Sequence, residues 1–136
     1  MPKISFTKKY SFSAAHRLHS EQLSAEQNMN VFDKCNNQYG HGHDYFVEVT
    51  VAGTPDIETG MLISLAELDN AVNGFLATLE HKHLDLEIAH FKHITSTGEN
   101  IVQYLWQELD QRIPHNKLFH IRLWETNNNH FDIGRN

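Results

Sequence analysis

The sequence has 136 residues, the usual size of one domain, with a formal net charge of −6 and no run of basic residues. This charge argues against nucleic acid as a partner, because phosphate backbones recruit clustered Lys and Arg. No stretch is long and apolar enough to cross a membrane, and the N-terminal segment lacks the apolar core of a signal peptide. The single cysteine, Cys35, excludes an intrachain disulfide and favours a reducing compartment. We therefore expect one soluble, cytoplasmic domain over residues 1–136.

The first half of the chain carries two segments with the period of a strand. Apolar and polar residues alternate over residues 3–14, which predicts a half-buried strand. A polar stretch rich in Asn and Gln follows and predicts a long loop over residues 20–40. Alternation returns over residues 43–52 and predicts a second strand that ends at a turn.

Two helices are predicted next. Ser64 and Glu67 have capping-box spacing, in which each side chain satisfies a free backbone N–H, and an apolar stripe of helical period follows them. Ser96 and Glu99 repeat this spacing at the start of a second helix, which Pro114 ends.

The last part of the chain predicts a hairpin. Residues 118–126 alternate as a third strand, the run Asn127–Asn129 favours a turn, and residues 130–134 form a short last strand. The order is strand, strand, helix, helix, strand, strand. It predicts an α+β fold with a four-stranded antiparallel sheet and both helices packed on one face.

Three histidines form a candidate metal site. Residues two apart on a strand point the same way, so His41 and His43 present two imidazoles to one point. His16, near the end of the first strand, supplies a third nitrogen. Three imidazoles with an open fourth position are typical of catalytic zinc, although neutral imidazole also suits copper, nickel or iron. Two alternatives stay open, namely a pair of histidines without metal and a closed structural site that includes Cys35.

Other residues carry chemistry on their own. Cys35 lies in a polar segment, where a thiol is either inert or, near a divalent cation, a general base or nucleophile. Glu80 and His81 are adjacent, so they either tune a proton carrier or are two solvated residues. Glu125 ends the apolar face of the third strand, where its carboxylate either accepts two N–H groups from a guanidine-like heterocycle or faces water.

Six groups of residues resemble the 6-pyruvoyl tetrahydropterin synthase family, in family order and over nearly the whole chain. They are SFSAAHRL at 11–18, CNN at 35–37 leading to GHGH at 40–43, GM at 60–61, HKHLDL at 81–86, STGEN at 96–100 and WETNN at 124–128. The resemblance implies the tunnelling fold, in which subunits join their sheets into a barrel. It also implies a homohexamer of two stacked trimers, with active sites between subunits.

The resemblance also implies an activity, a zinc-dependent lyase that converts 7,8-dihydroneopterin triphosphate to 6-pyruvoyl tetrahydropterin and releases triphosphate. It gives the role of zinc ligands to His16, His41 and His43. It makes Cys35 the catalytic thiol, and His81 the catalytic histidine. It makes Glu125 the carboxylate that anchors the pterin, with Thr97 and Glu99 near the pterin pocket.

One position departs from the family pattern, because Glu80 stands where the family usually has Asp before the catalytic histidine. Asp85 is an alternative partner for His81. The closest competing function is 6-carboxytetrahydropterin synthase of the queuosine route. The gap of six positions between Cys35 and His41 favours the pyruvoyl enzyme over it. A non-catalytic zinc- and pterin-binding homologue and a generic zinc hydrolase are further alternatives, although H-E-x-x-H is absent from the sequence.

Overall fold

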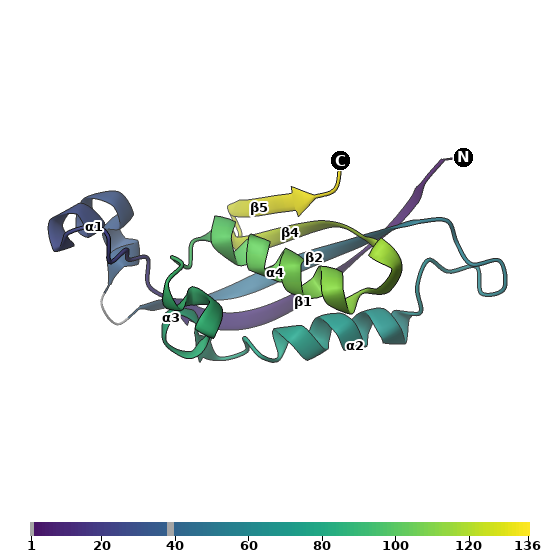
Figure 1. Cartoon of the computed structure of the whole chain (residues 1–136), viewed down its shortest axis with the longest axis horizontal. Helices are drawn as coiled ribbons and strands as arrows, with labels where there is room; N and C mark the ends of the chain where they lie inside the picture. The colour runs from purple at the N-terminus through teal and green to yellow at the C-terminus, as the bar shows by residue number, and fades with distance from the viewer. Residues whose placement is uncertain (1, 38–39) are drawn as a thin grey trace.

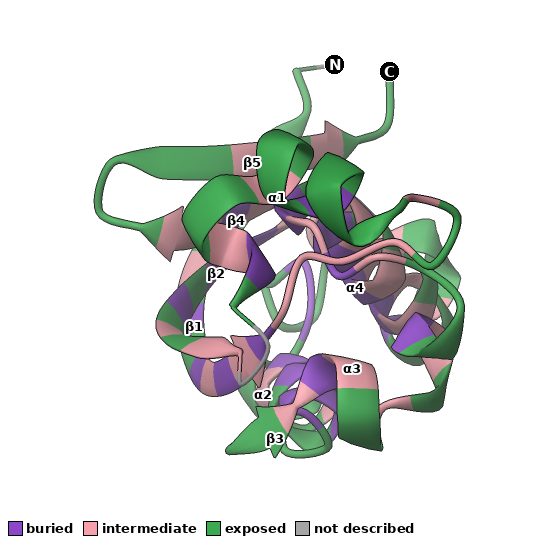
Figure 2. Ribbon diagram, turned by 90° about the vertical axis from the view of Figure 1, so that its left-hand side faces the viewer, coloured by how far each residue is buried: buried purple, intermediate pink, exposed green. Residues whose placement is uncertain are grey.

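Two long antiparallel strands form the centre of the fold in the computed structural model, which describes residues 2–37 and 40–136. β1 (Ile4–His16) pairs with β2 (His41–Gly53) along its whole length, and His16 lies opposite His41. Side chains of both strands alternate between a buried and a more exposed face, which Figure 2 shows as bands along β1. Both strands run further than predicted and carry their histidines to one end of the sheet.

The sheet has five strands in the order β3-β1-β2-β4-β5. β4 (Leu118–Thr126) pairs with β2 and continues through a tight turn into β5 (Asn129–Gly134). These four antiparallel strands match the prediction. The fifth, β3 (Lys82–His83), is parallel to the end of β1 and was not predicted, because two residues are too few to show alternation.

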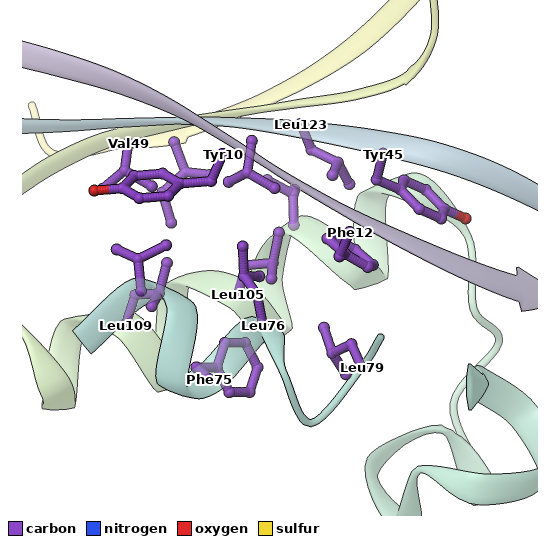
Figure 3. Close-up of a cluster of buried hydrophobic side chains, with 14 of the residues drawn as sticks. Tyr10, Phe12, Tyr45, Val49, Phe75, Leu76, Leu79, Leu105, Leu109 and Leu123 are labelled. Atoms are coloured by element: carbon purple, nitrogen blue, oxygen red, sulfur yellow. The ribbon is translucent and has the colours of Figure 1, made fainter. Parts of the chain in front are cut away.

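Two helices cover one face of the sheet, as predicted (Figure 1). α2 (Leu65–Leu76) and α4 (Gly98–Arg112) contact each other, and their buried side chains meet those of the strands in a single core (Figure 3). Phe75, Leu105 and Leu109 are almost fully buried there. Burying each such side chain contributes about 1.5–3 kcal/mol to folding. The predicted α+β class is confirmed.

The two helix starts differ in how well they were predicted. The Ser64 side chain accepts a hydrogen bond from the backbone N–H of Glu67 at 3.4 Å, as expected of a cap. The cap of α4 is Thr97 rather than Ser96, since the Thr97 hydroxyl accepts from the N–H of Asn100 at 3.2 Å. Ser96 is fully buried, and its hydroxyl donates elsewhere. The predicted cap at Ser96 was therefore wrong by one residue.

The expected loop over residues 20–40 contains α1 (Ala25–Phe32) and the 3₁₀ turn η1 (Asp33–Asn36). A capping box between Ser24 and Gln27 starts α1, which lies beyond the end of the sheet (Figure 1). α1 is almost entirely exposed, so its sequence has no apolar stripe to reveal it. Positions 38–39 of the expected loop lie outside the described residues.

Three short elements complete the chain. α3 (Leu84–Glu87) and the 3₁₀ turn η2 (Ala89–Lys92) connect β3 to α4, and the 3₁₀ turn η3 (Pro114–Asn116) connects α4 to β4. Among the residues described, no helix combines the length and apolar character that crossing a membrane requires.

Candidate active site

Three histidines converge where β1 ends and β2 begins. Their possible ligand atoms all lie within 4.8 Å of one another. The ring centroid of His16 lies 4.7 Å from that of His41 and 5.1 Å from that of His43. Two features cause this convergence, namely the two-residue spacing on β2 and the register that pairs His16 with His41.

The nitrogens of this cluster fit a bound cation. His16 Nε2, His41 Nδ1 and His43 Nε2 are buried, and none has a hydrogen-bond partner in the part of the chain that the structure describes. Burial lowers the pKa of His16 and of His41, which keeps both imidazoles neutral with a free lone pair. A set of three imidazole nitrogens suits zinc and other borderline divalent metals.

A chain of hydrogen bonds orients His16. Its Nδ1–H donates to the carbonyl of Ser96 at 2.7 Å, which leaves Nε2 free to bind a metal. The Ser96 hydroxyl donates to Asp85 Oδ1 at 2.8 Å. Asp85 Oδ2 accepts from the backbone N–H of Arg17, the residue after His16, at 2.7 Å. Asp85 thus holds the backbone next to His16 and the residue that orients its ring.

Glu125 of β4 lies on the same face as the histidines. Its Oε2 is 3.9 Å from His16 Nε2, and its side chain is only 18% exposed. Asn129 donates a long hydrogen bond of 3.4 Å to its other oxygen. This carboxylate therefore retains accepting capacity next to the cluster of imidazoles.

Cys35 lies on η1 and is half-buried rather than exposed. Burial raises the pKa of its thiol, and the nearby carboxylates of Glu125 and Asp33 raise it further. Surrounded by protein groups alone, the thiol stays protonated at neutral pH. A cation near the thiol would oppose this effect by stabilising the thiolate.

Glu80 and His81 lie at the other edge of β1, where the chain enters β3. Glu80 Oε1 is 3.5 Å from His81 Nε2 and also accepts from the backbone N–H of Ser13 at 3.1 Å. The side chain of His81 is 83% exposed, and its backbone is left-handed with φ of 57°. His81 and His43 line one open hollow of the surface. A carboxylate thus accompanies the exposed imidazole despite the departure from the family pattern.

Thr97 and Glu99 lie at the start of α4, directly after the residue that orients His16. The Thr97 hydroxyl caps the helix, whereas the Glu99 side chain is exposed in the first turn. Gly98 between them packs against Phe131, since a Cβ atom there would lie 2.0 Å from the phenyl ring. This contact ties the start of α4 to β5.

Sequence reasoning missed two residues of this region. Asp85 was considered only as a partner for His81, but its oxygens bind Ser96 and Arg17 instead. Tyr45 falls within the strand predicted over residues 43–52 and was given no role, although its ring lies next to the histidines. Its position two residues after His43, on the same face, was the available signal.

The fold and the clustered histidines define an α+β protein with a candidate metal centre. Residues 5–136 match the family model described as 6-pyruvoyl tetrahydropterin synthase. The 6-pyruvoyl tetrahydrobiopterin synthase of Homo sapiens is 43% identical over 124 residues, covering 90% of this chain and 86% of the human protein. The 6-carboxy-5,6,7,8-tetrahydropterin synthase of Rickettsia bellii is 26% identical, covering 92% of this chain and 96% of the other.

A solved structure of a protein that carries the family's name is also similar to this chain. The 6-pyruvoyl tetrahydropterin synthase of Caenorhabditis elegans superimposes with a TM-score of 0.95 at 38% identity, covering 100% of this chain and 98% of the other. The chain belongs to the 6-pyruvoyl tetrahydropterin synthase family. The predicted tunnelling fold and the predicted class, a lyase of this type, are confirmed.

Proposed function

We propose that this chain converts 7,8-dihydroneopterin triphosphate to 6-pyruvoyl tetrahydropterin, with release of triphosphate, at a zinc ion held by His16, His41 and His43. The observation that carries the proposal is the set of three buried imidazole nitrogens without partners, which lie within 4.8 Å of one another. The relatives named 6-pyruvoyl tetrahydrobiopterin synthase support the substrate and the product.

The chain's own residues would move the protons. Bound zinc would act as a Lewis acid that acidifies the two side-chain hydroxyls of the substrate and the adjoining C–H groups. The Cys35 thiolate would remove a proton from the side chain. His81 is exposed, so it can exchange protons with water. It would transfer protons on the side of the substrate's side chain opposite Cys35. Glu80 would stabilise its imidazolium across the 3.5 Å contact.

Glu125 would anchor the pterin ring. The pterin edge offers a ring N–H beside an exocyclic amine, a spacing that matches the two oxygens of one carboxylate. The carboxylate of Glu125 is mostly buried and lies next to the cluster of histidines, which suits this pairing. Glu99 and Thr97, at the start of α4, would border the pterin pocket.

Assembly into a homohexamer of two stacked trimers is part of the proposal. Within the described chain, β3 and β5 are the two ends of the sheet, and each leaves a strand edge that another subunit can pair with. A partner subunit would also bring a second set of catalytic groups close to each metal. The chain is expected to work in the cytoplasm.

One experiment tests the proposal. The purified protein, loaded with zinc, is incubated with 7,8-dihydroneopterin triphosphate, and the product is identified by its mass. We expect 6-pyruvoyl tetrahydropterin, because the pyruvoyl enzymes are the more similar relatives and Cys35 lies six positions before His41. A carboxylated pterin would assign the chain to the carboxy enzymes. Bound zinc without any turnover would leave it a non-catalytic homologue.

A further inference from the structure

Tyr45 of β2 is a fully buried residue between the core and the three histidines. Its ring stacks on Phe12 with the centroids 4.8 Å apart and the planes 11° apart. The ring centroids of His43 and His16 lie 5.5 Å and 6.2 Å away. In Figure 3 its oxygen points out of the apolar cluster, away from Phe12 and Leu79.

The hydroxyl of Tyr45 has no hydrogen-bond partner among the residues that the structure describes. Buried hydroxyl groups are nearly always paired, because an unpaired one loses its hydrogen bonds to water without replacement. Tyr10 of β1 illustrates the usual solution, since its hydroxyl donates to Asp69 Oδ1 at 2.8 Å. The unpaired hydroxyl of Tyr45 therefore requires an explanation.

The groups around this hydroxyl make it a donor. A phenol carries its proton at neutral pH, so the hydroxyl of Tyr45 can donate one hydrogen bond. Both oxygens of Asp85 already accept hydrogen bonds, from Ser96 and Arg17. The hydroxyl of Tyr45 therefore has a proton without an acceptor. It lies between the core and the three histidines, where an oxygen-rich substrate is expected.

We propose that the Tyr45 hydroxyl donates a hydrogen bond to an oxygen atom of the substrate's dihydroxypropyl side chain. Tyr45 is then a substrate-binding residue, an assignment that rests on the proposed function of this site. The stacking on Phe12 fixes the ring, so the donor is oriented before the substrate arrives. In the complex with substrate, the substrate oxygen supplies the acceptor that this hydroxyl otherwise lacks.

Tyr45→Phe tests this assignment, because it removes only the oxygen and keeps the stacked ring. The probe is neopterin, which carries the same side-chain diol, titrated into the zinc-loaded protein by calorimetry. We expect neopterin affinity and kcat/KM for the triphosphate substrate each to fall about tenfold or more, the effect of losing one hydrogen bond. Zinc affinity stays unchanged, and Tm stays equal or rises because an unpaired polar group has gone.

Tyr10→Phe is the matched control in the middle of β1. Tyr10 lies six positions before His16 on the strand, roughly 20 Å away. Losing the bond to Asp69 lowers Tm and leaves neopterin affinity unchanged. Wild-type neopterin affinity and kcat/KM in Tyr45→Phe would overturn the assignment. A wild-type protein that binds neopterin but does not turn over the triphosphate would refute the proposed reaction, and the neopterin titration would still decide the role of Tyr45.

Discussion

Asp85 offers a direct test of how the fold positions His16 in the proposed metal site. Asp85→Ala leaves two donors without their acceptor, the hydroxyl of the buried Ser96 and the backbone N–H of the half-buried Arg17. These groups determine where His16 lies, because Ser96 accepts from His16 Nδ1 and Arg17 follows His16 in the chain. The substitution therefore loosens a proposed metal ligand without touching the metal.

The size of the effect follows from the two bonds. Each hydrogen bond to a charged group contributes about 1.5–3 kcal/mol. The Asp85 side chain is 22% exposed, so water replaces part of what is lost. We expect the free energy of unfolding of the metal-free protein to fall by about 2–4 kcal/mol. Loss of a partner that orients a metal ligand typically weakens metal affinity ~10–100-fold, and we expect zinc affinity to fall within that range.

Asp85→Asn is the matched control. Its amide oxygen can accept from Arg17 N–H while its amide N–H donates to the Ser96 oxygen, so both contacts persist. Urea unfolding in the presence of a chelator measures stability, and competition with a chromophoric chelator measures zinc affinity. Asp85→Ala with the zinc affinity of the wild type would refute the reasoning, as would an Asp85→Asn variant as weak as Asp85→Ala.

Three further predictions concern the proposed catalytic thiol, the pterin and the assembly. Cys35→Ala should keep the fold and the zinc but lower kcat ~10²–10⁴-fold, as expected when a positioned acid or base is lost; a rate within about threefold of the wild type would make the thiol a bystander. Glu125→Gln should cost ~2–5 kcal/mol of pterin binding by calorimetry with unchanged zinc content, because a donor then faces a donor. Equal affinities would place the pterin elsewhere. Light scattering at micromolar concentration should give six chains per particle, and a monomer would contradict the proposed assembly.

The sequence predicted those parts of the fold that rest on local periodicity. β1, β2 and β4 each bury one face, so their alternation was visible in the sequence. α1 was missed because its apolar residues are exposed, as with Met29 at 54% and Val31 at 64%. The start of α4 was one residue off because Ser96 and Thr97 both have side chains that can cap a helix, and the buried Ser96 hydroxyl binds Asp85 instead.

In the candidate site, too, local spacing was predictable and contacts between distant parts of the chain were not. The spacing of His41 and His43 predicted two converging imidazoles, and pairing of the strands explains the third, His16. The contacts of Asp85 were not predictable, because one of them joins residues 68 positions apart. Tyr45 has the position and the burial of a core residue, and only the geometry shows that its hydroxyl lacks a partner.

The central claim is that the three-histidine cluster is a metal centre on which turnover depends. The direct measurement is the rate of conversion of 7,8-dihydroneopterin triphosphate as zinc is added stepwise to the metal-stripped protein. We expect no turnover without metal and a linear rise that saturates at one zinc per chain. Full activity of the stripped protein, or an unchanged titration after replacement of His41 and His43 by alanine, would contradict the account.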